Sequence, residues 1–548
     1  MAKVLKIHRD AAVKLVGAFF CGFLVVGIFF FHPIRKIKLS KNQLSSLQKE
    51  LPKTWNPSNV RDQDLYLWTV DFHASPIACN FEILEQAGAR IHAEVDFNNC
   101  IHYPATCKKR LKVLSYDDWR GFSLDPCPRK LKRDFYEAYR VDKEFSRLDV
   151  VICSHPVANC ELFLPFNKSM IVYATTRIEF GRFDENIDWR QPYIQEEKSR
   201  SRWIQWLNNL VVLSKNDRNI IAANNLYDVF AIEYYTGIKA LYLPSWCDFV
   251  KESSEDKNDD DDDYGDDDDG VVKSDTVILG PYRDNLKSGW NHPIYKDLTR
   301  ALAANRTTGR RFEKLRDLYP TYDSLKVLQA HPCIVLMPYQ VSFMSFFEYY
   351  RLGIPLYVPS KRLLLDWDTS HNIMWERMYG NVKREVILDF GKDGNRNSRW
   401  FSLARNDGKR VDSDILPDGF EGINVASLPN PATRTAFARW IDFCDFYVFP
   451  FIQTFDSWDE LIEKIELHES NGTHKKIRQQ MQIHSRQEKN HLIRAWKMIF
   501  DELKEDSPPG SRTVPQSFEA GLKDFYGKNT KSLVFNAKTD NEVCPVFN

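Results

Sequence analysis

The stretch from His331 to Ser360 has the sequence HPCIVLMPYQVSFMSFFEYYRLGIPLYVPS and predicts one βαβ unit. Cys333 to Met337 is a short apolar run without polar alternation, which is typical of a strand covered on both faces of a parallel sheet. After a turn, Ser342 is expected to cap an amphipathic helix. Gly353 and Pro355 then end that helix before a second apolar strand. A ligand of such a unit binds beyond the carboxyl ends of the strands, where a helix N-terminus offers free N–H groups.

Residues 345–356, SFFEYYRLGIPL, resemble the donor-site signature of GT-B glycosyltransferases, a helical Glu followed by Gly-x-Pro and a strand. The resemblance implies that Glu348 accepts hydrogen bonds from the ribose of a nucleotide sugar and that the helix N-terminus faces its diphosphate. Many retaining members have a second Glu eight positions earlier. Here that position is Gln340, which favours inversion. In an ordinary βαβ unit, Glu348 would instead form an ion pair with Arg351 or another neighbour.

The resemblance also implies further donor-binding residues in the same domain. With Glu348, the set is Arg283, Lys287, Tyr339, Gln340, Ser342 and Ser345. Arg283 and Lys287 follow an apolar run at Thr276–Gly280, and a cation there would stabilise the charge that develops on the leaving nucleotide. Some transferases give this role to a metal ion; here no metal and no cofactor besides a UDP- or GDP-sugar donor is expected. Solvated surface charges are the alternative for both residues.

Strands and helices alternate along both halves of the chain, which implies parallel sheets. In the first half we predict strands at Leu65–Val70, Leu148–Cys153, Met170–Ala174, Leu210–Ser214 and Ala240–Leu243, with helices at Phe81–Gly88, 129–146, Ala158–Phe163, Trp189–Asn208 and Lys215–Asn225. In the second half we predict strands at Thr276–Gly280, Cys333–Met337 and Leu356–Val358, with helices at Tyr295–Ala304, Lys361–Leu365, Ser457–Ile465 and 474–504. The last helix is expected to cross back over the first domain, as in GT-B proteins.

The predicted fold class is α/β, with two Rossmann-like domains facing a cleft (GT-B) after one N-terminal transmembrane helix. The predicted parts are a cytoplasmic tail (1–14), a transmembrane signal anchor (15–31), a stem (32–61), an acceptor-side Rossmann-like domain (62–250), an acidic disordered linker (251–274), a donor-binding Rossmann-like domain (275–480), a C-terminal helix (481–506) and an irregular tail (507–548). Within the first domain, residues 96–128 are expected to form an irregular insertion held by disulfides.

The acceptor side of a GT-B enzyme that inverts must supply a base within hydrogen-bond reach of the attacking hydroxyl. Asp71 and His73 are the candidates, since both follow the first strand and both side chains can titrate near neutral pH. His155, after the strand that ends at Cys153, and Arg177, after the next strand, are candidate acceptor contacts. A structural hydrogen bond or ion pair is the alternative for each of them.

The N-terminal residues predict a membrane anchor. Leu15 to Phe31 is an uncharged run that is long enough for a short transmembrane helix. Charged rather than small residues follow it, as in an uncleaved signal anchor. Formal net charge is zero over the whole chain, so the composition gives no case for a nucleic-acid partner.

Cysteines and glycosylation sequons favour a lumenal location for the rest of the chain. All but one of the 11 cysteines follow the predicted anchor, and a dense group between Cys79 and Cys160 predicts two or three disulfides rather than a zinc site, because no Cys-x-x-Cys pair is present. Asn-x-Ser/Thr sequons occur at Asn167, Asn305 and Asn471. The expected protein is a single-pass type II enzyme of the Golgi or ER membrane, with a glycan, glycoprotein or glycolipid as acceptor.

Two alternative functions are also compatible with the sequence. A membrane-anchored protein of the same fold could bind glycans or nucleotides without catalysis, which the glutamine at position 340 also allows. Alternatively, Asp366 and Asp368 form the Asp-x-Asp motif by which metal-dependent GT-A transferases hold a cation. The run of aspartates at 259–263 and 266–269 could capture calcium or manganese, but such a like-charge block is more typical of a disordered linker.

Overall fold

The computed structural model describes residues 64–71, 78–95, 112–114, 129–155, 157–175, 178, 206–207, 209–216, 218–247, 274–280, 289–305, 309–320, 325–374, 416–417, 419–420, 422–429, 436–506 and 513–527. Outside these residues lie the predicted anchor, the stem, nearly all of the acidic linker, His73, Arg177, Arg283 and Lys287. Among the described residues, no helix combines the length and the apolar character that a membrane crossing requires.

The first sheet is parallel and six-stranded in the described part of the chain. Its order is β2 (Ala89–Val95), β1 (Leu65–Asp71), β3 (Val150–Cys153), β4 (Ser169–Ala174), β5 (Asn219–Ala223) and β6 (Leu241–Tyr242). Every residue of β3, β4 and β5 is buried, which explains why these segments read as continuous apolar runs. Strand β2 was not predicted.

The second sheet is also parallel, with five described strands. Its order is β11 (Gln453–Phe455), β10 (Leu356–Pro359), β9 (Ile334–Leu336), β7 (Thr276–Gly280) and β8 (Arg311–Lys314). An α/β protein with two Rossmann-like parallel sheets is therefore confirmed. Both sheets belong to one compact unit, Gln63–Asn548.

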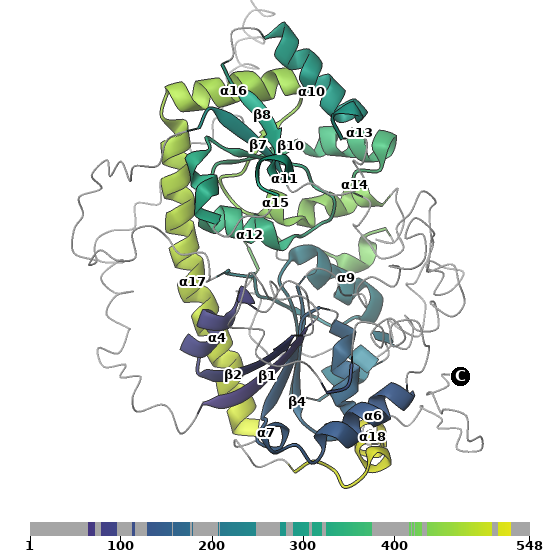
Figure 1. The fold of residues 1–548 in the computed structure, drawn as a ribbon. Helices are drawn as coiled ribbons and strands as arrows, with labels where there is room; N and C mark the ends of the chain where they lie inside the picture. The colour runs from purple at the N-terminus through teal and green to yellow at the C-terminus, as the bar shows by residue number, and fades with distance from the viewer. Residues whose placement is uncertain are drawn as a thin grey trace, which may run out of the picture. The chain divides into compact units, whose positions relative to one another are not determined.

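Helices surround both sheets (Figure 1). The α-helices are α4 (Phe81–Gln86), α6 (Arg129–Tyr139), α7 (Lys143–Ser146), α9 (Leu226–Thr236), α10 (Pro293–Ala304), α11 (Leu315–Leu318), α12 (Met344–Arg351), α13 (Lys361–His371), α14 (Phe437–Trp440), α15 (Asp445–Val448), α16 (Trp458–Ser470), α17 (Thr473–Asp506) and α18 (Phe518–Gly527). The 3-10 segments are η4 (Val157–Phe166), η7 (Gly289–Asn291), η8 (Leu325–Ala330), η10 (Val425–Ser427) and η11 (Ile441–Phe443).

The assignment of residues 210–225 from sequence was wrong. Residues 209–214 are helical, and the following strand is β5 rather than the predicted helix at Lys215–Asn225. Leu210, Val211 and Leu213 are all buried, so this helix is covered on every side. An apolar run of that kind has the same appearance as a buried strand, because periodicity distinguishes the two only when one face is polar.

The C-terminal segment has structure where none was expected. Helix α18 packs on η4 and α6. The Tyr526 hydroxyl donates to Asn209 Oδ1 at 2.9 Å, and Phe518 lies against Tyr136. Gly521 contacts the Pro165 backbone so closely that no side chain would fit there. This helix therefore completes the core of the first sheet.

Helix α17 contacts both halves of the molecule, as predicted for residues 474–504 (Figure 1). It packs on α12 beside the second sheet and on α4 beside the first. Lys489 forms an ion pair with Glu82 at 2.7 Å, and the Trp496 ring lies edge-on against Tyr173 of β4. Burial of Trp496 makes α17 part of the core of the first sheet.

Two disulfides occur among the described cysteines, in agreement with the prediction from cysteine density. Cys153, the last residue of β3, pairs with Cys160 of η4. Cys79, before α4, pairs with Cys247, which follows β6. Cys333 and Cys444 are buried thiols.

Candidate functional site

The strand order places a switch point in each sheet. In the first sheet, β1 lies between β2 and β3; in the second, β7 lies between β8 and β9. Chain connections therefore leave in opposite directions from β1 and β3, and likewise from β7 and β9. Open parallel sheets bind ligands beyond the carboxyl ends of the strands at such a point. The loop after β9, and α12 behind it, lie at the switch point of the second sheet.

Three of the predicted donor residues form a buried loop between β9 and α12. Tyr339, Gln340 and Ser342 are all buried, and the Gln340 amide donates to the Tyr339 hydroxyl at 3.2 Å. Ser342 is not the helix cap that we predicted, because α12 begins one residue later with Phe343 as its N-cap. No side chain caps that end. The ring of Phe343 packs on Tyr339 instead, which leaves the first N–H groups of α12 without a side-chain acceptor from the cap.

Glu348 lies on α12 with 6% of its surface exposed. Ser345, one turn earlier on the same helix, is half-buried. The Arg351 guanidinium, three residues further on, packs 4.4 Å from the centre of the Trp246 ring. Trp246 follows β6, so this contact joins α12 to the first sheet. Gly353 then ends the helix with a φ of +67°, as the Gly-x-Pro pattern predicted.

On the first sheet, Asp71 and His155, the two acceptor-side candidates that the structure describes, lie at the matching switch point. Asp71 is the last residue of β1, and Val70 before it pairs with Cys153 of β3. The backbone of Asp71 is therefore at the same edge as His155, which is half-buried two residues beyond β3. The Thr175 hydroxyl donates to the Ser154 carbonyl at 3.3 Å and ties the ends of β3 and β4 together.

The carboxyl edges of the two sheets meet at the start of α12. Asn224, directly after β5, donates one N–H to Ser245 Oγ at 3.0 Å and one to Met344 Sδ at 3.9 Å. Ser245 follows β6, and Met344 is the first residue of α12. Sequence reasoning missed Asn224 and Ser245 because it placed a helix over β5. A polar pair after the apolar run 219–223 was the available signal.

A buried polar network continues from this contact into α9. Asn225 caps α9 by accepting the Asp228 N–H at 2.8 Å, and its own amide donates to Asp228 Oδ2 at 2.7 Å. Asp228 Oδ1 accepts the Ile178 N–H at 3.1 Å. The Tyr173 hydroxyl donates to the Leu243 carbonyl at 2.7 Å, and burial raises its pKa. This edge of the first sheet is thus polar but closed to solvent.

A buried cation lies at the carboxyl end of β8, beside the strand at the switch point. Lys314 is 3% exposed, and its ammonium group lies 4.9 Å from the Trp290 ring centre and 4.7 Å from that of Tyr295. Burial lowers its pKa. Burial, His371 and Lys314 likewise lower the pKa of His292. Lys314 was not among the predicted site residues, since its strand could not be assigned from sequence.

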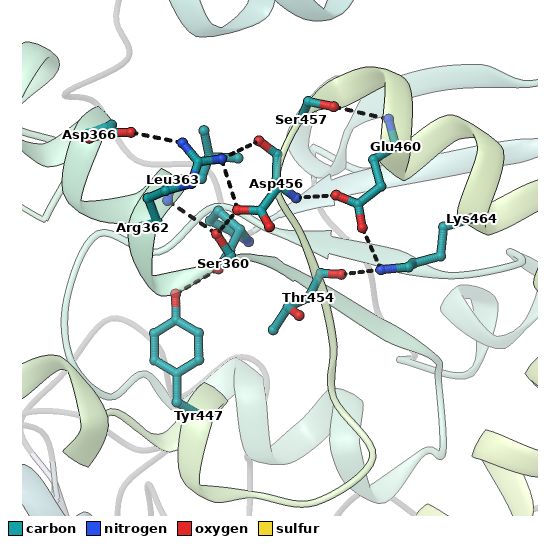
Figure 2. Close-up of polar contacts among 11 residues, drawn as sticks. Ser360, Arg362, Leu363, Asp366, Tyr447, Thr454, Asp456, Ser457, Glu460 and Lys464 are labelled. Carbon is teal, nitrogen blue, oxygen red and sulfur yellow. Dashed lines mark hydrogen bonds and ion pairs between the residues drawn. The ribbon is translucent and has the colours of Figure 1, made fainter. Parts of the chain in front are cut away.

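Strands β10 and β11 of the second sheet lead into an exposed polar network (Figure 2). Ser360, at the end of β10, donates its hydroxyl to Asp456, which follows β11. Arg362 of α13 donates to Asp456 at 2.9 Å, and the Asp456 N–H donates to Glu460 at 2.6 Å. Lys464 closes the network with Glu460 at 2.7 Å. The Ser360 hydroxyl and Arg362 hold the pKa of Asp456 below its usual range, so this network ties α13 to α16.

Asp366 and Asp368, on which the metal-dependent GT-A alternative depends, do not share one site. Both lie within α13 rather than after a strand. Asp366 is exposed and pairs with Arg362 at 3.2 Å, whereas Asp368 is buried and accepts the Met374 N–H at 3.0 Å. Among the described residues, no group of three or more His, Cys, Asp or Glu side chains could hold a metal ion. The second parallel sheet also disagrees with the single sheet of a GT-A enzyme.

The three sequons differ in accessibility. Asn471 is exposed in the turn between α16 and α17. Asn167 is half-buried and accepts from Arg218 at 3.1 Å. Asn305 ends α10 and donates to Asp459 at 3.1 Å. Asn471 is therefore the sequon best placed to accept a glycan.

Comparison with known proteins identifies no relatives, so any assignment of a function rests on the geometry of the site. No family model matches the chain, and no curated protein matches it. The likeness of residues 345–356 to the GT-B donor signature therefore remains a hypothesis.

Proposed function

We propose that this protein is a glycosyltransferase of the GT-B type, which moves a sugar from a UDP- or GDP-sugar to a glycan, glycoprotein or glycolipid. The observation that carries the proposal is the position of the buried Glu348, on the helix that starts at the switch point of the second sheet. Residues 345–356 carry this carboxylate in a sequence that resembles the GT-B donor signature, in which such a Glu accepts hydrogen bonds from the ribose of the donor.

The donor is bound along the carboxyl edge of the second sheet. The uncapped N-terminus of α12 accepts the diphosphate, since free N–H groups and the helix dipole favour an anion. Glu348 accepts from the ribose. Arg283 and Lys287, which follow β7 in sequence, supply positive charge to the leaving nucleotide. These cations replace a metal ion in this proposal.

The acceptor is bound at the carboxyl edge of the first sheet. Asp71 or His73 removes the proton of the attacking hydroxyl, whose oxygen forms a bond to the anomeric carbon as the bond to the nucleotide phosphate breaks. His155 and Arg177 contact the acceptor. Direct displacement of this kind inverts the anomeric configuration. The enzyme acts in the lumen of the Golgi or ER, anchored through residues 15–31.

The purified protein should be tested against a panel of UDP- and GDP-sugars by thermal shift and calorimetry, because specific binding raises the apparent stability. We expect one donor to bind, and Glu348→Gln to weaken that binding by roughly tenfold or more, since a hydrogen bond to a charged group contributes about 1.5–3 kcal/mol. Glu466→Gln, an exposed position on α16, is the matched control and should bind as the wild type does.

Two results would argue against the proposal. Absence of binding to every donor in the panel would remove its basis. Binding without sugar transfer or donor hydrolysis would instead support the non-catalytic protein of the same fold. A chelator should leave both binding and transfer unchanged, and a requirement for manganese or magnesium would contradict the metal-free mechanism.

A further inference from the structure

A second carboxyl group is buried where the two halves of the molecule meet. Asp445 is the first residue of α15 and has 1% of its surface exposed. Its N–H donates to the Val341 carbonyl at 3.3 Å, in the loop between β9 and α12. Asp445 is thus attached to the loop that leads into the proposed donor helix, but its own role does not depend on a bound donor.

The segment 436–449 fills the space between α12 and α9. On one side, Phe449 packs on Phe346 of α12 with ring centres 5.1 Å apart. On the other side, Phe443 packs on Phe230 of α9 at 4.6 Å, and Trp440 packs on Tyr227 at 5.2 Å. Asp445 lies within this aromatic layer, so any change of its charge acts on the contact between the second sheet and the first.

The surroundings of Asp445 are unsuited to a negative charge. Neither carboxyl oxygen makes a hydrogen bond, and the nearby Ser342 hydroxyl, also fully buried, makes none of ordinary geometry. Burial, and to a smaller extent the charge of Asp228 on α9, raises the pKa of Asp445 well above its usual value despite an opposing effect of Ser342. No described lysine, arginine or histidine lowers that pKa.

Other groups near Asp445 are neutral or acidic as well. Tyr173 of β4, Tyr242 of β6 and Cys444, the cap of α15, each have a pKa that burial raises first and that Asp445 raises further. The charge of Glu488 on α17 also raises the pKa of Tyr242. Lys361 acts on the neighbouring Cys444, but no cation among the described residues offsets the charge of Asp445 itself.

We propose that Asp445 is a proton-dependent switch, which holds α12 and the loop before it against α9 while its carboxyl group is protonated and releases them when it ionises. Repulsion from Asp228 and the cost of a buried, unpaired carboxylate drive the release. The switch would make the region where the two carboxyl edges meet more open as pH rises.

Hydrogen exchange of the full-length chain tests this without any ligand. Peptides from α12 and α9 should be followed at pH 6 to 9, with protection factors corrected for the intrinsic pH dependence of exchange. In the wild type, protection should fall by up to tenfold per pH unit as pH rises towards the raised folded-state pKa of Asp445, and should level off above it. Asp445→Asn, which resembles the protonated acid in shape and charge, should show no such fall above about pH 7, where Glu488 no longer contributes.

Three controls make the result decisive. Asp442→Asn, an exposed carboxyl on the same segment that pairs with Lys361, should show the wild-type fall, whereas Glu488→Gln should change it only below about pH 7. Asp228→Asn removes a charge that raises the pKa of Asp445, so the fall should end at a lower pH, and this variant serves as the test if Asp445→Asn does not fold. Constant protection in the wild type, or an unchanged fall in Asp445→Asn, would overturn the switch.

Discussion

At the scale of single residues, the half-buried Glu488 gives the structure a definite pH signature. Burial raises the pKa of this carboxyl to about 7. Because the folded state then holds a proton that the unfolded state has lost, the contribution of Glu488 to stability is complete below its unfolded pKa and disappears as pH rises through 7.

Glu488→Gln should remove this contribution. The stability difference between wild type and variant should change by up to about 1.4 kcal/mol per pH unit between roughly pH 5 and pH 7, and should be constant above that range. Urea unfolding at several pH values measures it. Glu505→Gln, an exposed position on the same helix, is the control, and a pH-independent difference for Glu488→Gln would contradict the raised pKa.

Half-buried histidines change the free energy of unfolding with pH in the opposite direction to Glu488. The difference in unfolding free energy between wild type and Glu488→Gln is therefore more informative than either value alone. Burial, His468 and nearby arginines lower the pKa of His474 to about 4. His474 Nε2 and His468 Nδ1 both lie 2.8 Å from the Tyr357 hydroxyl, an arrangement that suits neutral rings. The contribution of His474 is present above about pH 6.5 and is lost as pH falls through 4, so it opposes that of Glu488 where the two ranges overlap.

At the scale of elements, Gly353 is the residue on which the end of α12 depends. Its φ is +67°, and an added Cβ would lie 3.1 Å from Arg478 Cγ and 3.3 Å from the Arg478 carbonyl oxygen. Gly472, between α16 and α17, has a φ of +73° but open space around it. A side chain at either position would therefore strain the backbone, but only at position 353 would it also crowd a neighbour.

Gly353→Ala should destabilise the protein more than Gly472→Ala. The positive φ costs each variant of order 1–3 kcal/mol, and the contact with α17 adds to that cost only at position 353. Denaturant midpoints of the two variants make the comparison. Equal losses would mean that α17 can shift without penalty, and that its packing on Gly353 is unimportant.

Local patterns in the sequence predicted most elements but not all of them. The run Thr276–Gly280 became β7 with the same bounds, and the Gly-x-Pro pattern placed the end of α12. The same reasoning failed at residues 209–223, where a fully buried helix precedes a fully buried strand and neither has a polar face. Strand β8 was left unassigned because three of its four residues are charged, so it forms no apolar run although Lys314 is buried. Helix α18 was missed because its binding surface lies in a distant part of the chain.

At the scale of the whole molecule, the disulfides should differ in their effect on stability. Cys79 and Cys247 are separated by 168 residues and Cys153 and Cys160 by 7. The chain-entropy relation gives about 5 kcal/mol for the longer loop and about 2 kcal/mol for the shorter one. Double Cys→Ala variants compared by urea unfolding should keep this order, and a reversed order would indicate that packing, not loop closure, decides their contribution.

The candidate site was predictable only in part, for a reason that applies to the whole molecule. The loop before α12 and Glu348 lie within one contiguous stretch, and their placement followed from local pattern. Asn224, Ser245 and Asp445 come together with that stretch, and Lys314 comes to the edge strand β8 of the same sheet, only through the arrangement of strands. Single-sequence periodicity contains no information on which distant segments meet, and therefore these residues required the structure.

The position of α17 and α18 at the end of the chain affects how the protein is made. Trp496 and Phe518 fill the core of the first sheet, whose strands are synthesised much earlier. Asn209 and its hydrogen-bond partner Tyr526 are 317 residues apart in the chain. Synthesis of this stretch takes roughly 15–60 s at 5–20 residues per second. During that time the apolar residues of η4 lack the cover that α18 supplies. Uncovered apolar surface makes a growing chain prone to aggregation, and a chain that lacks α18 would keep an incomplete core beside the first sheet.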